Sequence, residues 1–408
     1  MATFQRGAAG FGPTLAGRQI SLAVAAGLAA AMGVGRFVFT PILPIMVASA
    51  GISAQDGAII ATGNYAGYLA GAVLLTRLPQ LSRRTTFIAW SLVLVVSEAA
   101  MALSANLAFL TALRFAAGLA SAAIFIACAS TIAHHRQEGA SAGLAFAGVG
   151  VGIAITGVFT LVAGRWLSWQ QLWFGAAVLT MLLLWPAWLL DIRNESGPVG
   201  DTGAGGGGGS TPVAAAVRRS WRLLVASYFS EGVGYIIVGT FLVAAVASHA
   251  GRQSPVGALL WTAVGLAAVP ATMLWNAVAH RVGSGPALTA ALVIQSAGIA
   301  AAALSDSLVA ELAAAVAFGA TFMGVSMLTL EAGARLGVPR AAASLTAAYA
   351  VGQMLGPLVV APVLGSSYRV AFVIAAGLVA ASAALATAAA RARHGITSDP
   401  EPARSRDR

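Results

Sequence analysis

Residues Gln19 to Thr40 read QISLAVAAGLAAAMGVGRFVFT, and Arg36 is the only charged residue among them. An α-helix needs about 20 mostly apolar residues to cross the hydrocarbon core of a bilayer. Arg6 and Arg18 precede the stretch, as basic residues do in a secretory signal peptide, but the stretch is too long for the apolar region of such a peptide. We therefore expect an uncleaved first membrane-spanning helix.

Eleven further apolar runs of similar length follow this one. Together they predict an all-α integral membrane protein of twelve transmembrane helices, with spans near 19–40, 55–77, 85–104, 107–133, 140–163, 170–190, 220–247, 255–279, 285–304, 308–330, 340–363 and 368–390. Apolar residues make up 59% of the chain and charged residues 9%, which excludes a water-soluble protein because too few polar side chains remain to cover its surface.

The net charge of +10 comes from arginine alone, since the chain has no lysine. Nucleic-acid binding would require these charges on one face, whereas they fall in short loops between apolar runs. Eighteen arginines lie on the side of both termini, three on the other side, and two within spans. Because basic loops stay in the cytoplasm, we expect both termini to be cytoplasmic. We expect the protein itself to lie in the inner membrane of a bacterium. The single cysteine, Cys128, excludes an intrachain disulfide.

The spans divide six and six. We expect a first half over 1–193, a flexible cytoplasmic linker over 194–217, a second half over 218–394 and a disordered tail over 395–408. The linker contains a run of glycines from Gly205 to Gly209. A phosphate-binding glycine loop would need a preceding strand and a following Gly-Lys-Ser/Thr, and the sequence has neither.

An internal repeat supports this division. Gly33-Val34-Gly35 recurs 199 residues later as Gly232-Val233-Gly234, Thr40 recurs as Thr240, and Gly118 recurs as Gly319. Matches at nearly constant offset in corresponding spans predict two pseudo-symmetric six-helix halves, the architecture of the major facilitator superfamily.

Two segments carry a narrower resemblance. MGVGRFVFTPILPIM, from Met32 to Met46, and GNYAGYLAGA, from Gly63 to Ala72, resemble the YbfB/YjiJ family of bacterial transporters within that superfamily. The resemblance implies a secondary transporter but no particular substrate. The superfamily's span-four signature Arg-x-x-x-Gly is matched by Arg114 and Gly118, whereas its acidic loop signature after span two is not matched.

Four ionisable residues fall inside spans, where such groups are costly and face a cavity or each other. Glu231 lies near the middle of span seven, and a contact with Arg36 across the two halves is plausible. Glu231 then either carries the coupled proton or forms a fixed ion pair. Arg36 alternatively binds an anionic substrate or extends to the membrane interface. Glu98 and Arg114 lie at similar depth, and pairing between them is the structural alternative to a functional role.

Polar side chains in the spans are candidates for substrate contact, and the alternative is hydrogen bonding between helices. They are Asn64, Tyr65, Tyr68, Tyr235 and Gln353. Small residues and one proline are expected to pack helices closely and to form a gating seam between the halves. They are Gly33, Gly35, Gly148, Gly150, Gly152, Gly157, Gly232, Gly234, Gly352, Gly356 and Pro357. The adjacent His134 and His135 point apart on a helix, so we expect a loop role and no metal.

These observations predict a secondary active transporter that moves a small organic solute by alternating access, coupled to protons through Glu231. The alternative is an uncoupled facilitator, or an organic-anion exchanger with Arg36 as its anion site. A sensor would carry a soluble output domain, and no catalytic or nucleotide-binding motif indicates an enzyme. We expect a monomer in the bilayer, with no cofactor and no nucleic-acid partner. The substrate and the direction of transport stay open.

Overall fold

The computed structural model describes residues 17–77, 84–190, 192, 212–250, 254–365 and 367–397. Most of these residues are helical, and none of them lies in a β-strand. Eleven segments are long and apolar enough to cross a membrane, and the bent pair α10 and α11 makes twelve. The predicted all-α membrane fold is therefore confirmed.

The first six spans form one half of the molecule. The first span consists of α1 (Gly17–Leu28), the π-helical turn η1 (Ala29–Val34), α2 (Gly35–Phe37) and α3 (Phe39–Ser49). It is followed by α4 (Ala54–Arg77), α5 (Arg84–Ala100) with the turn η3 (Met101–Leu103), α6 (Leu107–His134) with the turn η4 (His135–Glu138), α7 (Ala142–Ala163) and α8 (Trp169–Ala187).

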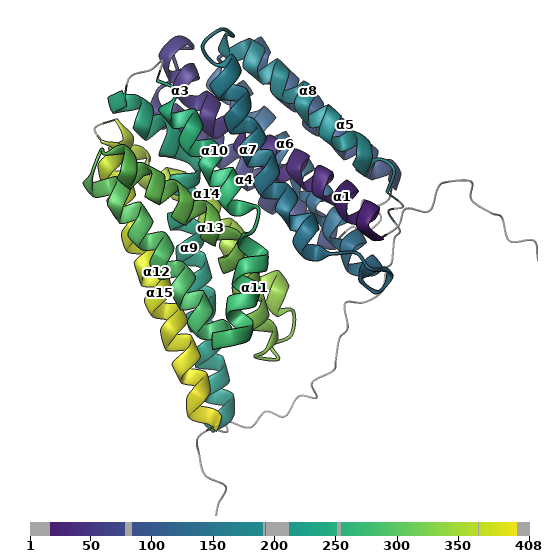
Figure 1. Cartoon of the computed structure of the whole chain (residues 1–408), viewed down its shortest axis with the longest axis vertical. Coiled ribbons are helices and arrows are strands. Elements are labelled where there is room, and N and C mark those ends of the chain that lie inside the picture. The colour runs from purple at the N-terminus through teal and green to yellow at the C-terminus, as the bar shows by residue number, and fades with distance from the viewer. Residues whose placement is uncertain are drawn as a thin grey trace, which may run out of the picture.

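The last six spans form the other half. They are α9 (Pro212–Ala250), the pair α10 (Val256–Ala268) and α11 (Ala271–Val282), α12 (Ser284–Leu304), α13 (Leu308–Ala334), α14 (Ala341–Leu364) and α15 (Tyr368–Thr397). In Figure 1 the purple and blue helices of the first half lie beside the green and yellow helices of the second.

Prolines explain two breaks within spans. Pro41 clashes with the carbonyl four residues earlier, that of Phe37, and α2 ends at Phe37. Pro270 lies between α10 and α11, whose axes are bent by 46°. The first break places the short α2, with Arg36 on it, in the middle of the span.

The linker and tail boundaries differ from the prediction. Residues 212–217 belong to α9, since a proline suits the first position of a helix and Ala214 to Ala216 favour its continuation. Likewise α15 continues to Thr397, and Ser220 Oγ of α9 donates to Ala389 O of α15 at 2.8 Å. The remainder of the predicted linker and tail lies outside the described residues.

At the interface between the halves, the second span of each half contacts the fifth span of the other. The second span of the first half, α4, contacts the fifth span of the second half, α14. Conversely α7, the fifth span, contacts α10, and α3 contacts α9. This crosswise pairing is what a two-fold relation between the halves requires, in agreement with the repeat in the sequence.

Successive spans cross in alternate directions, which defines two ends of the bundle. We call the end where α1 begins and α15 ends the terminal face, and the other end the opposite face. Toward the opposite face the halves are joined closely. Thr40 Oγ1 donates to Gly239 O at 2.5 Å, and the hydroxyls of Tyr65 and Thr240 lie 2.9 Å apart. Thr40 and Thr240, the pair found in the repeat, therefore both bond across the halves.

The glycines serve close packing, but most lie elsewhere than expected. Of the glycines expected at the seam, only Gly150 and Gly157 face the other half, where they pack on α10 and on Val269 directly after it. Gly33, Gly148 and Gly152 pack α1 and η1 against α7 within the first half, and Gly35 packs on Leu94 of α5. Within the second half, Gly232, Gly352 and Gly356 lie between α9 and α14, and Gly234 packs on α15. Pro357 is buried inside α14. The seam between the halves therefore involves α7 and α10 rather than all the predicted positions.

Candidate functional site

Arg36 is a buried cation in the middle of the bundle, with 2% of its surface exposed. Its guanidinium donates to the side-chain oxygen of Gln353 on α14, in the other half. Its central carbon lies 4.8 Å from the ring centre of Tyr68 and 5.0 Å from that of Tyr65. No ion pair between described residues includes Arg36, and its Nε has no hydrogen-bond partner. The charge is thus held by a neutral amide and by aromatic faces.

Arg114 holds the backbone that carries Arg36. Its two terminal nitrogens each donate at 2.8 Å, one to Gly35 O and the other to Arg36 O. These carbonyls lie where α2 gives way to α3, so the regular helical bonds are interrupted there. Asn64 Nδ2 in turn donates to Arg114 O at 3.1 Å. Arg114 and Asn64 therefore position α2; for Asn64 this is the expected alternative of hydrogen bonding between helices, and for Arg114 it differs from the expected pairing with Glu98.

Glu98 on α5 is buried near this group without being paired. It is 1% exposed, neither carboxyl oxygen has a partner at hydrogen-bonding distance, and the nearby Thr180 hydroxyl interacts with the carboxyl group. The expected pair with Arg114 is not formed among the described ion pairs, because Arg114 is directed to the carbonyls of α2. Equal depth in the membrane therefore did not bring the two side chains into contact.

Glu231 lies apart from Arg36, and the plausible contact between them is absent from the described ion pairs. Its Oε1 accepts a hydrogen bond from Gln295 Nε2 on α12 at 3.4 Å, and its Oε2 has no partner. The Tyr349 hydroxyl interacts with this carboxyl group. Tyr235 and Tyr349 also interact with Arg36, so the two tyrosines connect the two charged groups that were expected to touch.

Five of the chain's six tyrosines gather here. Tyr349 stacks on Tyr228 with ring centres 4.2 Å apart and on Tyr235 at 5.2 Å. Phe322 of α13 stacks on Tyr235 at 6.2 Å. We call Arg36, Gln353 and the tyrosines Tyr65, Tyr68, Tyr228, Tyr235 and Tyr349 the central cluster. Both halves contribute to it, so the cluster lies at the interface between them.

A cleft of about 710 Å³ lies between the halves on the terminal side of the cluster. It is lined by α6 and α7 of the first half and by α11 and α13 of the second, with Phe125, Phe146, Met273, Met323 and Ser326 among the lining residues. The ring of Phe125 lies 6.4 Å from that of Tyr68, and Ser326 interacts with Tyr228. The cleft therefore borders the central cluster through Phe125 and Ser326, while the contacts of Thr40 and Tyr65 lie on the other side of the cluster.

Several residues near the cluster escaped prediction. Tyr349 lies one turn before Gln353, Tyr228 lies one turn before Glu231, and Gln295 is the amide in span nine. For the two tyrosines, the position one helical turn from a predicted residue was the available signal. Trp261 of α10 is fully buried, contacts Phe37 and donates to Thr156 Oγ1 at 3.1 Å. His135 Nδ1 lies 2.9 Å from Thr131 O, and the described residues hold no cluster of metal ligands.

Comparison with known proteins finds a family whose profile matches the sequence and solved structures that share the fold. The profile of the family described as "Uncharacterised MFS-type transporter YbfB" matches residues 28–389. Two solved structures of the nucleoside transporter NupG, one of them a mutant, superpose with a TM-score of 0.68. They share 14% and 13% identity with this chain, cover 92% of it, and are themselves covered over 99% and 98% of their length. No match was found in the search of curated proteins.

Proposed function

Since the chain belongs to the family of the MFS-type transporter YbfB, we propose that it is a secondary transporter of small organic anions with Arg36 as the anion-binding group. Membership of this family and the fold make the protein a membrane transporter. The substrate class rests on the central cluster.

The observation that carries the proposal is the charge on Arg36. A buried cation is costly unless a charge or several hydrogen bonds compensate it. Here one amide oxygen and the tyrosine rings provide the compensation, while Nε has no partner. An arginine offers a planar fork that matches a carboxylate. A carboxylate reaching Arg36 would complete this arrangement, and the surrounding rings favour a substrate with a flat apolar body.

The cleft supports alternating access. It extends from the terminal face toward the central cluster, while hydrogen bonds of Thr40 and Tyr65 join the halves toward the opposite face. Arginine is concentrated in the loops and ends of the terminal face, so we place that face in the cytoplasm of a bacterial cell. The conformation would then be open to the inside.

Glu231 is the group proposed to carry a coupled proton. It is fully buried, and its only described hydrogen-bond donors are neutral side chains, so no fixed cation holds it in its charged form. Tyr349 contacts both Glu231 and the surroundings of Arg36. Binding of an anion at Arg36 would therefore shift Tyr349 and change the hydrogen bonding of Glu231. In the alternative, an uncoupled facilitator or exchanger, Glu231 keeps one protonation state throughout.

A nucleoside is the second candidate substrate. The stacked rings of Tyr228, Tyr235 and Tyr349 would suit a nucleobase, and NupG, which shares the fold, is a nucleoside transporter. A neutral nucleoside would leave Arg36 without a counter-charge, which is why the anion is preferred.

A thermal-shift screen of the purified protein tests the proposal. It pairs aromatic carboxylates with their amides of equal size and includes a set of nucleosides. We expect stabilisation by carboxylates and not by the matched amides. Stabilisation by nucleosides alone would exclude the anion proposal.

A further inference from the structure

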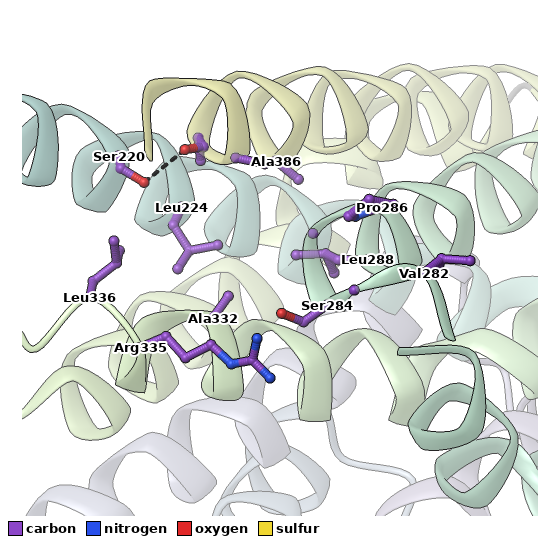
Figure 2. A pocket seen from close by; sticks show the side chains of 14 residues that line it. Ser220, Leu224, Val282, Ser284, Pro286, Leu288, Ala332, Arg335, Leu336 and Ala386 are labelled. Atoms are coloured by element: carbon purple, nitrogen blue, oxygen red, sulfur yellow. Dashed lines mark hydrogen bonds between the residues drawn. The ribbon is translucent and has the colours of Figure 1, made fainter. Parts of the chain in front are cut away.

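A second cavity lies in the half formed by α9 to α15, at the terminal face and away from the central cluster. It has a volume of about 340 Å³ and is lined by α9, α13, α15 and the start of α12 (Figure 2). Leu224, Leu288 and Leu336 give it an apolar side, and Ser220, Ser284 and Arg335 give it polar groups. None of the described residues that line it is acidic.

The start of α12 supplies hydrogen-bond donors to this cavity. Gly283 precedes the helix with φ of 89°, and no side chain caps the helix. The first backbone bond of the helix runs from Ala287 N to Gly283 O, and Pro286 has no N–H. The N–H groups of Ser284 and Gly285 are thus free of helical partners, at the end of the helix that attracts negative charge.

Ser284 is a second and independent sign of a ligand. Its side chain is 5% exposed, and its hydroxyl makes no hydrogen bond with any described residue. In Figure 2 this hydroxyl points toward the middle of the lining side chains. The neighbouring Ser220, by contrast, donates to Ala389 O at 2.8 Å. Ser284 is largely buried, while its hydroxyl oxygen is accessible from the cavity, so a ligand there can supply the hydrogen-bond partner that the protein does not.

Arg335 provides the positive charge. It lies at the end of α13, and its NH2 pairs with Glu331 one turn earlier in the helix. This pair is half exposed and contributes little to stability. An arginine has five N–H donors in a planar fork, so several remain for an anion in the cavity.

We propose that this cavity binds a phosphate group. Arginine, a hydroxyl and the free N–H groups of a helix start together suit a group with several charged oxygens. The two sources of such a group are an anionic phospholipid headgroup and inorganic phosphate. The three leucines and the location at one end of the spans favour the headgroup, because acyl chains would continue along the apolar side. The inference does not depend on the substrate proposed for the central cluster.

Two variants and one control test it on the full chain in detergent. Ser284→Ala removes the hydroxyl, and Arg335→Gln removes the charge. Arg369→Gln is the control, since Arg369 forms a comparable exposed pair with Asp306 at the opposite face. Native mass spectrometry measures retained phosphatidylglycerol against phosphatidylcholine. Thermal unfolding in inorganic phosphate against chloride at equal ionic strength tests the other source.

We expect phosphatidylglycerol to bind preferentially, and Arg335→Gln to weaken it about fivefold, as one arginine contributes at an anionic membrane surface. Ser284→Ala should weaken it less, and Arg369→Gln not at all. If the two variants change only the stabilisation by inorganic phosphate, the site takes free phosphate. If wild type, Ser284→Ala and Arg335→Gln behave alike in both measurements, the proposal is overturned.

Discussion

The guanidinium of Arg36 donates to the side-chain oxygen of Gln353, and this bond joins the first span of the first half to the fifth span of the second half. Both residues lie in the central cluster, between the cleft and the closed contacts of Thr40 and Tyr65. A change of conformation that separates the halves would break the bond. A substrate anion at Arg36 would replace Gln353, which connects binding to the movement of the halves.

Arg114 is predicted to stabilise the fold and to act on transport only through α2. Arg114→Gln would leave the Gly35 and Arg36 carbonyls without donors, at a cost of about 3 kcal/mol. The Tm of the detergent-solubilised protein should therefore fall by several degrees. Arg114→Lys, which can reach one carbonyl, should recover part of the loss. An unchanged Tm in Arg114→Gln would contradict a positioning role.

Gly157 is predicted to be required for closure of the opposite face. A Cβ there would lie 2.6 Å from Thr262 N of α10. Gly157→Ala should hold the halves apart at that end and narrow the cleft at the terminal face. Gly377→Ala is a matched control, because a Cβ at this helical glycine meets nothing within 4 Å.

Cysteine labelling can test this prediction by measuring how accessible the cleft is. The single native cysteine, Cys128, is buried. Met273→Cys, in a chain without Cys128, places a thiol in the cleft. An impermeant maleimide should label it more slowly when Gly157→Ala is added, and at the same rate with Gly377→Ala. Equal labelling in both would show that the contact with α10 does not control the cleft.

Glu231 is predicted to be needed for coupling and not for exchange. Glu231→Gln keeps the shape, the hydrogen bond from Gln295 and the neighbourhood of Tyr349 but cannot release a proton. In proteoliposomes the variant should retain counterflow of the substrate, because exchange needs no net proton movement. Accumulation driven by a pH gradient should disappear. If wild-type accumulation ignores the gradient, the uncoupled alternative holds and Glu231 is structural.

The fold could be predicted from the sequence because a membrane span can be recognised from the length and apolarity of a sequence segment alone. Most spans lie within a few residues of the expected bounds, and the repeat indicated the two halves. Misjudged ends fell where a helix continues past its apolar stretch, as α9 does by beginning at Pro212; its bond to α15 is made further along, from Ser220 to Ala389 O.

The site was less accessible to sequence reasoning. Depth along a helix can be counted, but the direction in which a side chain points depends on the tilt and rotation of each span. Glu231 therefore faces Gln295 rather than Arg36, and Arg114 faces backbone carbonyls rather than Glu98. Tyr228 and Tyr349 were missed because an aromatic residue in an apolar span looks like ordinary packing until its neighbours are known.

The most direct test of the central claim is the affinity of the purified protein for an aromatic carboxylate and its matched amide, in wild type and in Arg36→Gln. Isothermal titration calorimetry measures both, with Arg165→Gln in an exposed loop as control. We predict that wild type and the control prefer the carboxylate. Arg36→Gln should lose about 2 kcal/mol or more, at least about 30-fold in Kd, for the carboxylate only. Equal affinity of wild type and Arg36→Gln for the carboxylate would contradict the account.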